Sequence, residues 1–241
     1  GVVLAMATAR TAAMGFNRIV DVRYDAQNPR TANRELPRGA MTMREAVTLV
    51  TVASVAFVAV TWTLGPLCFA LSPIALGIVF WYSLAKRFTT YTQLFLGLAL
   101  AVAPMGGWLA AGGTWGWPPW FLALGTALWV AGFDILYACV DIEVDRAQGL
   151  KSIPARFGVE TSLVISRVFH VSAVASLAAI AIVMPLGPLY LAGVVGVGAL
   201  LAYEQSMVRS DDLSRVKQAF DLNGWVGILY LMTTAGSIYV S

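Results

Sequence analysis

Charged residues are scarce in this sequence. The 241 residues are 59% hydrophobic and only 12% charged, with a mean hydropathy of +0.74. A soluble domain usually carries about twice that charged fraction. Apolar stretches of about twenty residues recur, and each is long enough to cross a hydrocarbon core of roughly 30 Å. This composition excludes an ordinary soluble domain and predicts a polytopic membrane protein whose first partner is the lipid bilayer.

Cysteine and histidine are almost absent. Cys68 and Cys139 lie far apart inside apolar runs, so we expect neither a disulfide framework nor a thiolate metal site. With His170 as the single histidine, zinc hydrolase chemistry and a Ser-His-Asp triad have little support, and a role in helix packing is favoured. The chain opens with Gly1 in an apolar stretch that has no signal-peptide features, and we expect the natural N-terminus to lie upstream.

The apolar runs define eight segments, which are 1–17, 43–64, 66–85, 90–111, 119–139, 159–184, 187–207 and 220–240. Every lysine and arginine outside these segments lies in 18–42, 86–89, 140–158 or 208–219, and the alternate turns near 65, 112–118 and 185–188 have none. The positive-inside rule therefore places the first set in the cytoplasm. We predict an all-α transmembrane bundle in a single domain, 1–241, with eight helices here and a further helix mostly missing upstream.

The first acidic cluster follows the first apolar segment. Asn17, Asp21 and Asp25 are four residues apart, so on a helix they line one face. Arg10, seven residues before Asn17, points the same way. Pro29 sets the expected limit of this helix, because a proline disfavours helix at the residue before it.

The second acidic cluster is "FDILYACVDIEVD", at the cytoplasmic end of the fifth segment. On a continuous helix Asp134, Asp141 and Asp145 form one stripe within about 40°. Acids close to lipid are costly and are usually functional. For a single cluster, salt bridges with nearby arginines are an equally good explanation, but two clusters at cytoplasmic helix ends favour a site.

Carboxylate and amide oxygens without His or Cys suit Mg²⁺ or Ca²⁺. Mg²⁺ commonly uses one or two carboxylates and takes its remaining ligands from water and substrate phosphates. The neighbouring basic residues are therefore candidate phosphate contacts: Arg18, Arg34, Lys86, Arg87, Lys151 and Arg156. The two clusters together predict a magnesium–diphosphate site.

These motifs resemble a known family. "NRIVDVRYD" is similar to the NxxxDxxxD motif, and "DILYACVDIEVD" to the YxxxDxxxD motif, of the UbiA superfamily of intramembrane aromatic prenyltransferases. "NPRTANRELPRG", "GLKSIPARFG", "WYSLAKRFT" and "FDLNG" resemble its 4-hydroxybenzoate polyprenyltransferase branch. The resemblance implies nine helices around a central cavity and two Mg²⁺ ions that bridge the diphosphate of a prenyl donor.

The resemblance also implies residue roles. The metal–diphosphate residues would be Asn17, Asp21, Asp25, Asp141 and Asp145, of which Asp21 and Asp141 count as catalytic. Tyr82 and Lys86 resemble a pair near the diphosphate and the reactive carbon, and Asp134 would orient the acceptor or bind a tyrosine hydroxyl. The remaining substrate contacts would be Arg10, facing the acceptor carboxylate or the diphosphate, with Arg18, Arg34, Tyr137, Lys151 and Arg156. Lys151 and Arg156 would lie in a lid loop. Many relatives carry an acid where this chain has Arg18.

The implied reaction transfers a polyprenyl group from its diphosphate to a ring carbon of an aromatic acid, at the cytoplasmic side of an inner membrane. The favoured acceptor is 4-hydroxybenzoate, for ubiquinone, and a dihydroxynaphthoate, for menaquinone, is the alternative. An ion-coupled transporter would place acids near the bilayer midplane on broken helices, which this pattern does not. A noncatalytic assembly subunit is a further alternative. We expect neither a nucleic acid nor an obligatory protein partner.

Overall fold

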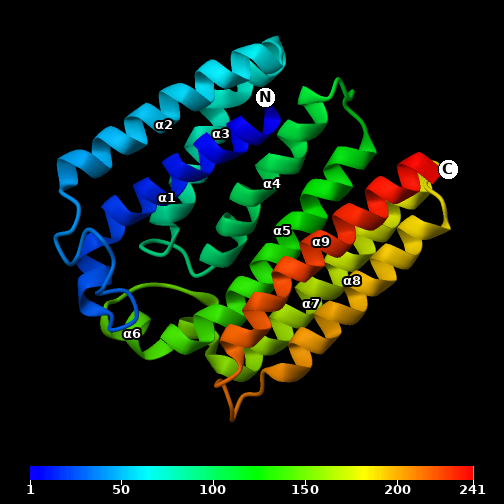
Figure 1. The fold of residues 1–241 in the computed structure, drawn as a ribbon. Coiled ribbons are helices and arrows are strands. Elements are labelled where there is room, and N and C mark those ends of the chain that lie inside the picture. The colour runs from blue at the N-terminus through cyan, green and yellow to red at the C-terminus, as the bar shows by residue number, and fades with distance from the viewer. Residues whose placement is uncertain (241) are drawn as a thin grey trace. The chain divides into compact units, whose positions relative to one another are not determined.

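The computed structural model describes residues 1–240, and within them it forms helices and no strand (Figure 1). Eight long helices correspond to the eight predicted segments, so the predicted all-helical fold is confirmed. One short helix, α6, and a 3₁₀ turn are additional. The helices are α1 (Val2–Gln27), α2 (Met43–Leu64), α3 (Pro66–Ala85), α4 (Thr92–Ala110), α5 (Trp117–Ala138), α6 (Ile142–Ala147), α7 (Ile153–Val183), α8 (Pro188–Met207) and α9 (Val216–Val240).

The helix ends follow local sequence signals. At the start of α2 the Thr42 hydroxyl accepts from the Glu45 amide at 3.2 Å, and the Glu45 carboxylate accepts from the Thr42 amide at 2.7 Å. This reciprocal pair is a capping box. Prolines occupy the first turn of α3, α5, α7 and α8, where a missing N–H costs nothing. The helix α1 ends at Gln27, two residues before Pro29, as predicted.

Within residues 1–240, six stretches are long and apolar enough to cross a membrane. They are Met43–Leu64, Pro66–Ala85, Thr92–Ala110, Trp117–Ala147, Ile153–Val183 and Pro188–Met207. This number supports the multi-pass membrane protein that the composition predicts.

The chain divides into two compact units. The first comprises 1–88 and 106–114, and its helix α1 packs against both α2 and α3. Phe16 of α1 stacks on Phe80 of α3, with 4.6 Å between ring centroids. Gly15 lets α1 approach α2 closely, because a side chain there would collide with Val50. The close packing fixes the end of α1 that carries the first acidic motif.

The second unit comprises 89–105 and the described chain from Trp115 onward. Within it α5, α7, α8 and α9 run side by side (Figure 1). Its apolar core includes Leu177, Tyr190, Val197, Leu201 and Val226.

Small residues in this unit allow close helix contacts. Gly97 of α4 lies against the Ala127 backbone, and Gly193 of α8 lies against Thr233 of α9. These two glycines therefore serve helix packing.

Two boundaries differ from the sequence prediction. The helix α5 ends at Ala138 and continues as a 3₁₀ turn, Cys139–Asp141, before α6. The uninterrupted stripe predicted from Asp134 to Asp145 is therefore wrong, because a 3₁₀ turn has fewer residues per turn than an α-helix. The first residues of α7 precede a kink at Gly158, whose φ is +78°, and the long helix resumes near the predicted residue 159.

Candidate active site

Asp21 is the centre of a buried ion-pair cluster in the first unit. Its side chain is only 3% exposed, and Asn17, one turn earlier on α1, donates a hydrogen bond to its Oδ2 at 3.1 Å. At the end of α3, Lys86 Nζ lies 2.8 Å from Oδ2, and an Arg87 guanidinium nitrogen lies 3.3 Å from Oδ1. The predicted four-residue spacing thus brings Asn17 and Asp21 together, and the fold supplies two cations.

Asp25, one turn further along α1, forms a second buried ion pair. One guanidinium nitrogen of Arg34 donates to both of its carboxylate oxygens at 2.8 Å. The Thr31 hydroxyl donates to the Asp25 backbone carbonyl at 3.0 Å, which folds the loop after α1 back onto the helix. Arg34 lies beyond Pro29 in the sequence, and the folded-back loop brings its guanidinium to Asp25, a predicted metal ligand.

Arg18 belongs to the same cluster. Burial lowers the pKa of its guanidinium, and the neighbouring positive charge of Arg34 lowers it further. Asp25, Glu35 and Tyr82 act in the opposite direction. These interactions place Arg18 within electrostatic reach of Asp25 and of Tyr82, one turn before Lys86 on α3.

Arg87 has a hydrogen-bond donor at this site that no described residue accepts from. It donates to the Val20 carbonyl and contacts Asp21, but its buried Nε has no hydrogen-bond partner among the described residues. Lys86 and Arg87 both lie over the ring of Tyr24, at 5.8 and 5.5 Å from its centroid. A buried N–H without an acceptor is costly, so this position suits an anion that brings oxygen atoms.

The charges of this cluster favour an anionic ligand. Two buried carboxylates, Asp21 and Asp25, face four cations, Arg18, Arg34, Lys86 and Arg87. Positive charge is therefore in excess where the predicted diphosphate would bind. Arg10 is exposed on α1, and the cluster described here does not include it.

The second acidic motif lies where α5 ends and the chain continues as a 3₁₀ turn and then α6. Asp141 closes the 3₁₀ turn and Asp145 lies on α6, and both side chains are half-buried. The Ser152 hydroxyl donates to Asp145 Oδ2 at 3.0 Å and accepts from the Ala155 amide at 3.2 Å, which caps α7. One serine thus fixes both the motif carboxylate and the start of the next helix.

The loop between α6 and α7 carries the predicted basic residues. Gly149 turns the chain there with a φ of +69°, a conformation that favours glycine. Lys151 is exposed in the loop, as predicted, whereas Arg156 is exposed on the first turns of α7. The prediction that Arg156 lies in a loop is therefore wrong, because the Ser152 cap and Pro154 start the helix earlier.

Tyr137 and Asp134 lie on α5 just before the second motif, and both are half-buried. The Tyr137 ring lies 4.8 Å from the ring of Phe220 at the start of α9. Phe133 lies 5.4 Å from the same ring. An aromatic row on α5, completed by Phe220, therefore leads toward Asp141.

The residues present fit Mg²⁺ with a diphosphate. Each motif offers a pair of aspartates, and Mg²⁺ commonly takes one or two protein carboxylates when phosphate oxygens complete its coordination. The described residues contain no group of three or more His, Cys, Asp and Glu side chains placed to hold a metal. The unpartnered Arg87 Nε and the excess of positive charge are the observations in the first unit that fit a phosphate ligand.

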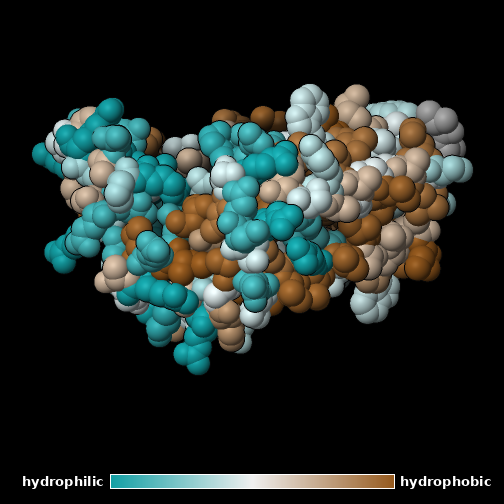
Figure 2. All heavy atoms as spheres, turned by 90° about the horizontal axis from the view of Figure 1, so that it is seen from below, coloured by the Kyte–Doolittle hydropathy of each residue, from teal (hydrophilic) through white to brown (hydrophobic). Residues whose placement is uncertain are grey.

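Figure 2 views the molecule from below and shows hydrophilic residues gathered on that face, with hydrophobic residues between and beside them. In the second unit the α6 region and the loop between α8 and α9 lie at this end (Figure 1). Both belong to the charged connections that the sequence assigned to one side of the membrane.

Three contributors were not assigned roles from the sequence. Tyr24 lies beneath the two cations, Ser152 holds Asp145, and the Gln93 side-chain oxygen accepts from the Ile153 amide at 3.2 Å. Only Ser152 had a local signal, because a serine followed by "IP" is typical of a helix N-cap. Tyr24 and Gln93 act through contacts between segments far apart in the chain, which spacing does not reveal.

The family of the chain follows from comparison with known proteins. The sequence pattern described as the UbiA prenyltransferase family matches residues 1–228. The chain belongs to this family. As a UbiA prenyltransferase it is an enzyme, which decides against the transporter and assembly-subunit alternatives. The predicted resemblance is confirmed.

Curated relatives and solved structures agree with this assignment. The chain is 33% identical to 4-hydroxybenzoate octaprenyltransferase of Vibrio campbellii over 230 residues, which are 95% of this chain and 81% of that protein. It is 31% identical to the protein of the same name from Alkalilimnicola ehrlichii, over 95% of this chain and 78% of that protein. A UbiA homolog from Aeropyrum pernix K1 matches with a TM-score of 0.90 and 33% identity, over 98% of this chain and 88% of that one.

Proposed function

We propose that the chain transfers a polyprenyl group from a polyprenyl diphosphate to a ring carbon of an aromatic acid, with 4-hydroxybenzoate as acceptor and ubiquinone as the end product. The observation that carries this proposal is the buried Asp21 carboxylate held between Asn17, Lys86 and Arg87. The names of the curated relatives support the acceptor. A UbiA homolog from Archaeoglobus fulgidus with the same fold is bound to GPP and Mg²⁺, which supports the donor and the metal.

The residues act on the diphosphate as it leaves. The allylic C–O bond of the donor ionises, and negative charge builds on the departing oxygen. Lys86, Arg87, Arg34 and Arg18 stabilise this charge in a buried setting, where electrostatic interactions are strong. Bound Mg²⁺ supplies Lewis-acid stabilisation of the same oxygens. Asn17, Asp21 and Asp25 would hold it from α1, and Asp141 and Asp145 from the second motif.

The acceptor then reacts at a ring carbon. The allylic cation forms a C–C bond with the electron-rich ring, and the ring proton leaves in the following step. We propose that Tyr82 lies beside the reactive carbon, that Tyr137 and Asp134 orient the acceptor, and that Lys151 and Arg156 contact the diphosphate from the α6–α7 side. Arg10 remains a proposed substrate contact.

We further propose that both units belong to one prenyltransferase domain in the inner membrane, with its active site toward the cytoplasm and two Mg²⁺ ions per donor. The family pattern runs through both units without interruption, which supports one domain. The location of every lysine and arginine connection on one predicted side supports the cytoplasmic orientation.

The test is a transfer assay in membranes. The protein is incubated with a prenyl diphosphate, Mg²⁺ and a panel of aromatic acids, and the lipids are analysed by mass spectrometry. We expect a prenylated 4-hydroxybenzoate. A prenylated dihydroxynaphthoate in its place would redirect the proposal to menaquinone. If no acid gains a prenyl chain, the proposed function is wrong.

A further inference from the structure

A buried carboxylate lies inside the second unit and belongs to neither acidic motif. Glu204 of α8 is 0% exposed, and neither of its carboxylate oxygens has a hydrogen-bond partner among the described residues. It also lies within a stretch that is apolar and long enough to cross a membrane. An ionised carboxylate in such a place, with no cation, would be strongly destabilising.

Asn223 of α9 lies within electrostatic reach of the Glu204 carboxyl group, although the two share no direct hydrogen bond among the described residues. The orientation of Asn223 is fixed. The Trp129 indole N–H, which can only donate, lies 2.6 Å from Asn223 Oδ1, and Asn223 Nδ2 donates to the Phe220 carbonyl at 3.1 Å. Because an amide oxygen has two lone pairs, Oδ1 can accept one more hydrogen bond. A protonated Glu204 would supply that donor.

The nearby histidine does not act as a counter-ion for Glu204. Ser166 donates to the Gly132 carbonyl at 2.7 Å, so its oxygen accepts from Gln205 Nε2, also at 2.7 Å. The same Gln205 nitrogen lies 3.0 Å from His170 Nδ1, which must therefore be an acceptor. An imidazole whose Nδ1 accepts a hydrogen bond is neutral, so His170 carries no positive charge. We call the buried polar side chains here the polar layer: Ser166, His170, Glu204, Gln205 and Asn223. None of them supplies a positive charge beside Glu204.

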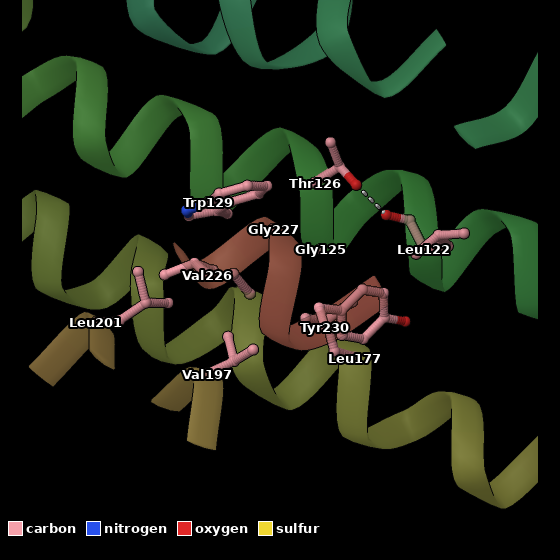
Figure 3. A pocket seen from close by; sticks show the side chains of 11 residues that line it. Leu122, Gly125, Thr126, Trp129, Leu177, Val197, Leu201, Val226, Gly227 and Tyr230 are labelled. Carbon is pink, nitrogen blue, oxygen red and sulfur yellow. Dashed lines mark hydrogen bonds between the residues drawn. The ribbon is translucent and has the colours of Figure 1, made fainter. Parts of the chain in front are cut away.

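The space next to this layer is apolar. A cavity of ≈ 50 Å³ is lined by residues of α5, α7, α8 and α9. Figure 3 shows Trp129 at one edge and Leu201 and Val226 along the wall. Cavities with such linings stay dry. Water from this cavity is therefore not available to solvate a charge on Glu204.

The polar layer is connected to the aromatic row of α5. Trp129, Phe133 and Tyr137 follow one another at four-residue steps, and the Trp129 and Phe133 rings lie 5.9 Å apart. Phe220, one turn before Asn223, closes the row against Phe133 and Tyr137. Asn223 therefore determines both the position of the Trp129 ring and the rotation of α9 that places Phe220.

We propose that Glu204 is a neutral, protonated acid and a positioning residue: its hydroxyl donates to Asn223, and Asn223 holds Trp129 and Phe220 in the aromatic row that receives the apolar chain of the donor. The protonation state follows from the geometry alone. The role of the aromatic row rests on the proposed function, because only a prenyl donor would bring an apolar chain to the aromatic side chains that lead toward Asp141.

The first experiment reads the protonation state without any turnover. Infrared difference spectra of the whole protein in lipid nanodiscs are recorded at neutral pH for the wild type and for Glu204→Gln. We expect the wild type to show the C=O band of a protonated carboxylic acid, with a deuterium shift, and the variant to lack it. If the variant instead loses carboxylate bands, Glu204 is ionised and the proposal is overturned.

The second experiment separates positioning from packing. Glu204→Gln keeps a neutral donor of the same shape, so its KM for the prenyl diphosphate should stay within roughly twofold of wild type. Glu204→Ala should raise that KM about tenfold or more, with a smaller change in kcat. The matched control is Leu201→Ala, one turn earlier on α8, which also leaves a buried cavity, beside Trp129, but removes no polar group.

The outcomes are distinct. An equal rise in KM for Leu201→Ala, or a Glu204→Gln variant that behaves like Glu204→Ala, would show that only general packing matters and would overturn the positioning role. If the wild type transfers no prenyl group to any acceptor, the proposed function is wrong, and the infrared spectra still decide the protonation state of Glu204.

Discussion

The two acidic motifs are alike in sequence and different in structure. The first lies on one uninterrupted helix, and its aspartates Asp21 and Asp25 are buried in ion pairs with Lys86, Arg87 and Arg34. The second is divided between a 3₁₀ turn and the six-residue α6, and a hydroxyl from Ser152 contacts Asp145. The same four-residue spacing of carboxylates thus gives two ion-paired aspartates on a packed helix in the first unit. In the second unit it gives an aspartate that accepts from the serine that caps α7.

This difference predicts that substitutions in the two motifs affect activity in different ways. The first motif is fixed before any ligand arrives, because helix packing and ion pairs already hold its side chains. The second includes an aspartate that accepts from the Ser152 hydroxyl, and it lies partly on a short helix next to a glycine with positive φ. We expect substitutions in the first motif to remove activity outright, and substitutions around the second to alter activity through local order.

The largest effect is expected at Asp21. Asp21→Asn keeps the side-chain shape but removes a proposed metal ligand and the charged partner of Lys86 and Arg87. We expect turnover to fall by about 10²-fold or more, as for the loss of a principal electrostatic contact. Diphosphate release is the measurement, and the matched control is Asp211→Asn, which changes an exposed loop acid of 70% side-chain exposure. Wild-type turnover in Asp21→Asn would remove the central role of this residue.

Removal of the metal tests both motifs together. With EDTA we expect prenyl transfer to cease and to return when Mg²⁺ is added. Mg²⁺ with prenyl diphosphate should also raise the melting temperature of the wild type, because a ligand that binds the native state stabilises it. Asp21→Asn should show a smaller rise. Full activity in EDTA would contradict the proposed cofactor.

Ser152 sharpens the comparison at the second motif. Ser152→Ala removes the α7 cap and the donor to Asp145, and we expect a loss of about 1 kcal/mol in unfolding free energy together with reduced transfer. Ser152→Thr retains the hydroxyl and should restore both. The measurements are thermal unfolding and initial rates at saturating donor. If Ser152→Ala keeps wild-type rates, Asp145 does not need this contact.

The smallest effect on activity is expected at Thr42. Thr42→Ala removes the capping box of α2, which contacts neither motif, at a cost of about 1 kcal/mol in unfolding free energy. The rate per folded molecule should not change. Thr42→Ala therefore separates the loss of a cap as such from the loss of the cap that also holds Asp145.

Much of the fold was predictable because lipid imposes long apolar helices. Seven of the eight predicted segments end within one residue of an observed helix, and Pro29 marked a true boundary. The first helix continues past the apolar segment that ends at residue 17 and reaches Gln27, as the four-residue spacing and Pro29 predicted. The 3₁₀ turn at Asp141 had no comparable signal, because the residues around it remain good helix formers.

The candidate site was predictable in its residue types and only partly in its contacts. The four-residue spacing correctly paired Asn17 with Asp21, because helical geometry is local. The partnership of Arg34 with Asp25 and of Arg87 with Asp21 depends on the return of the chain after Pro29 and on the packing of α3 against α1. Such contacts follow from tertiary packing, which the spacing of residues does not encode.

The pairing of Asp21 with Lys86 and Arg87 has a consequence for product release. A donor that enters must compete with carboxylates already bound to those cations, so its binding is an exchange of partners and its net free energy is smaller than its contacts alone would give. On the proposed function, the same cations would pair with Asp21 again after diphosphate leaves. They would thus have a partner both with and without the donor, so that strong binding of the leaving diphosphate would be compatible with rapid turnover.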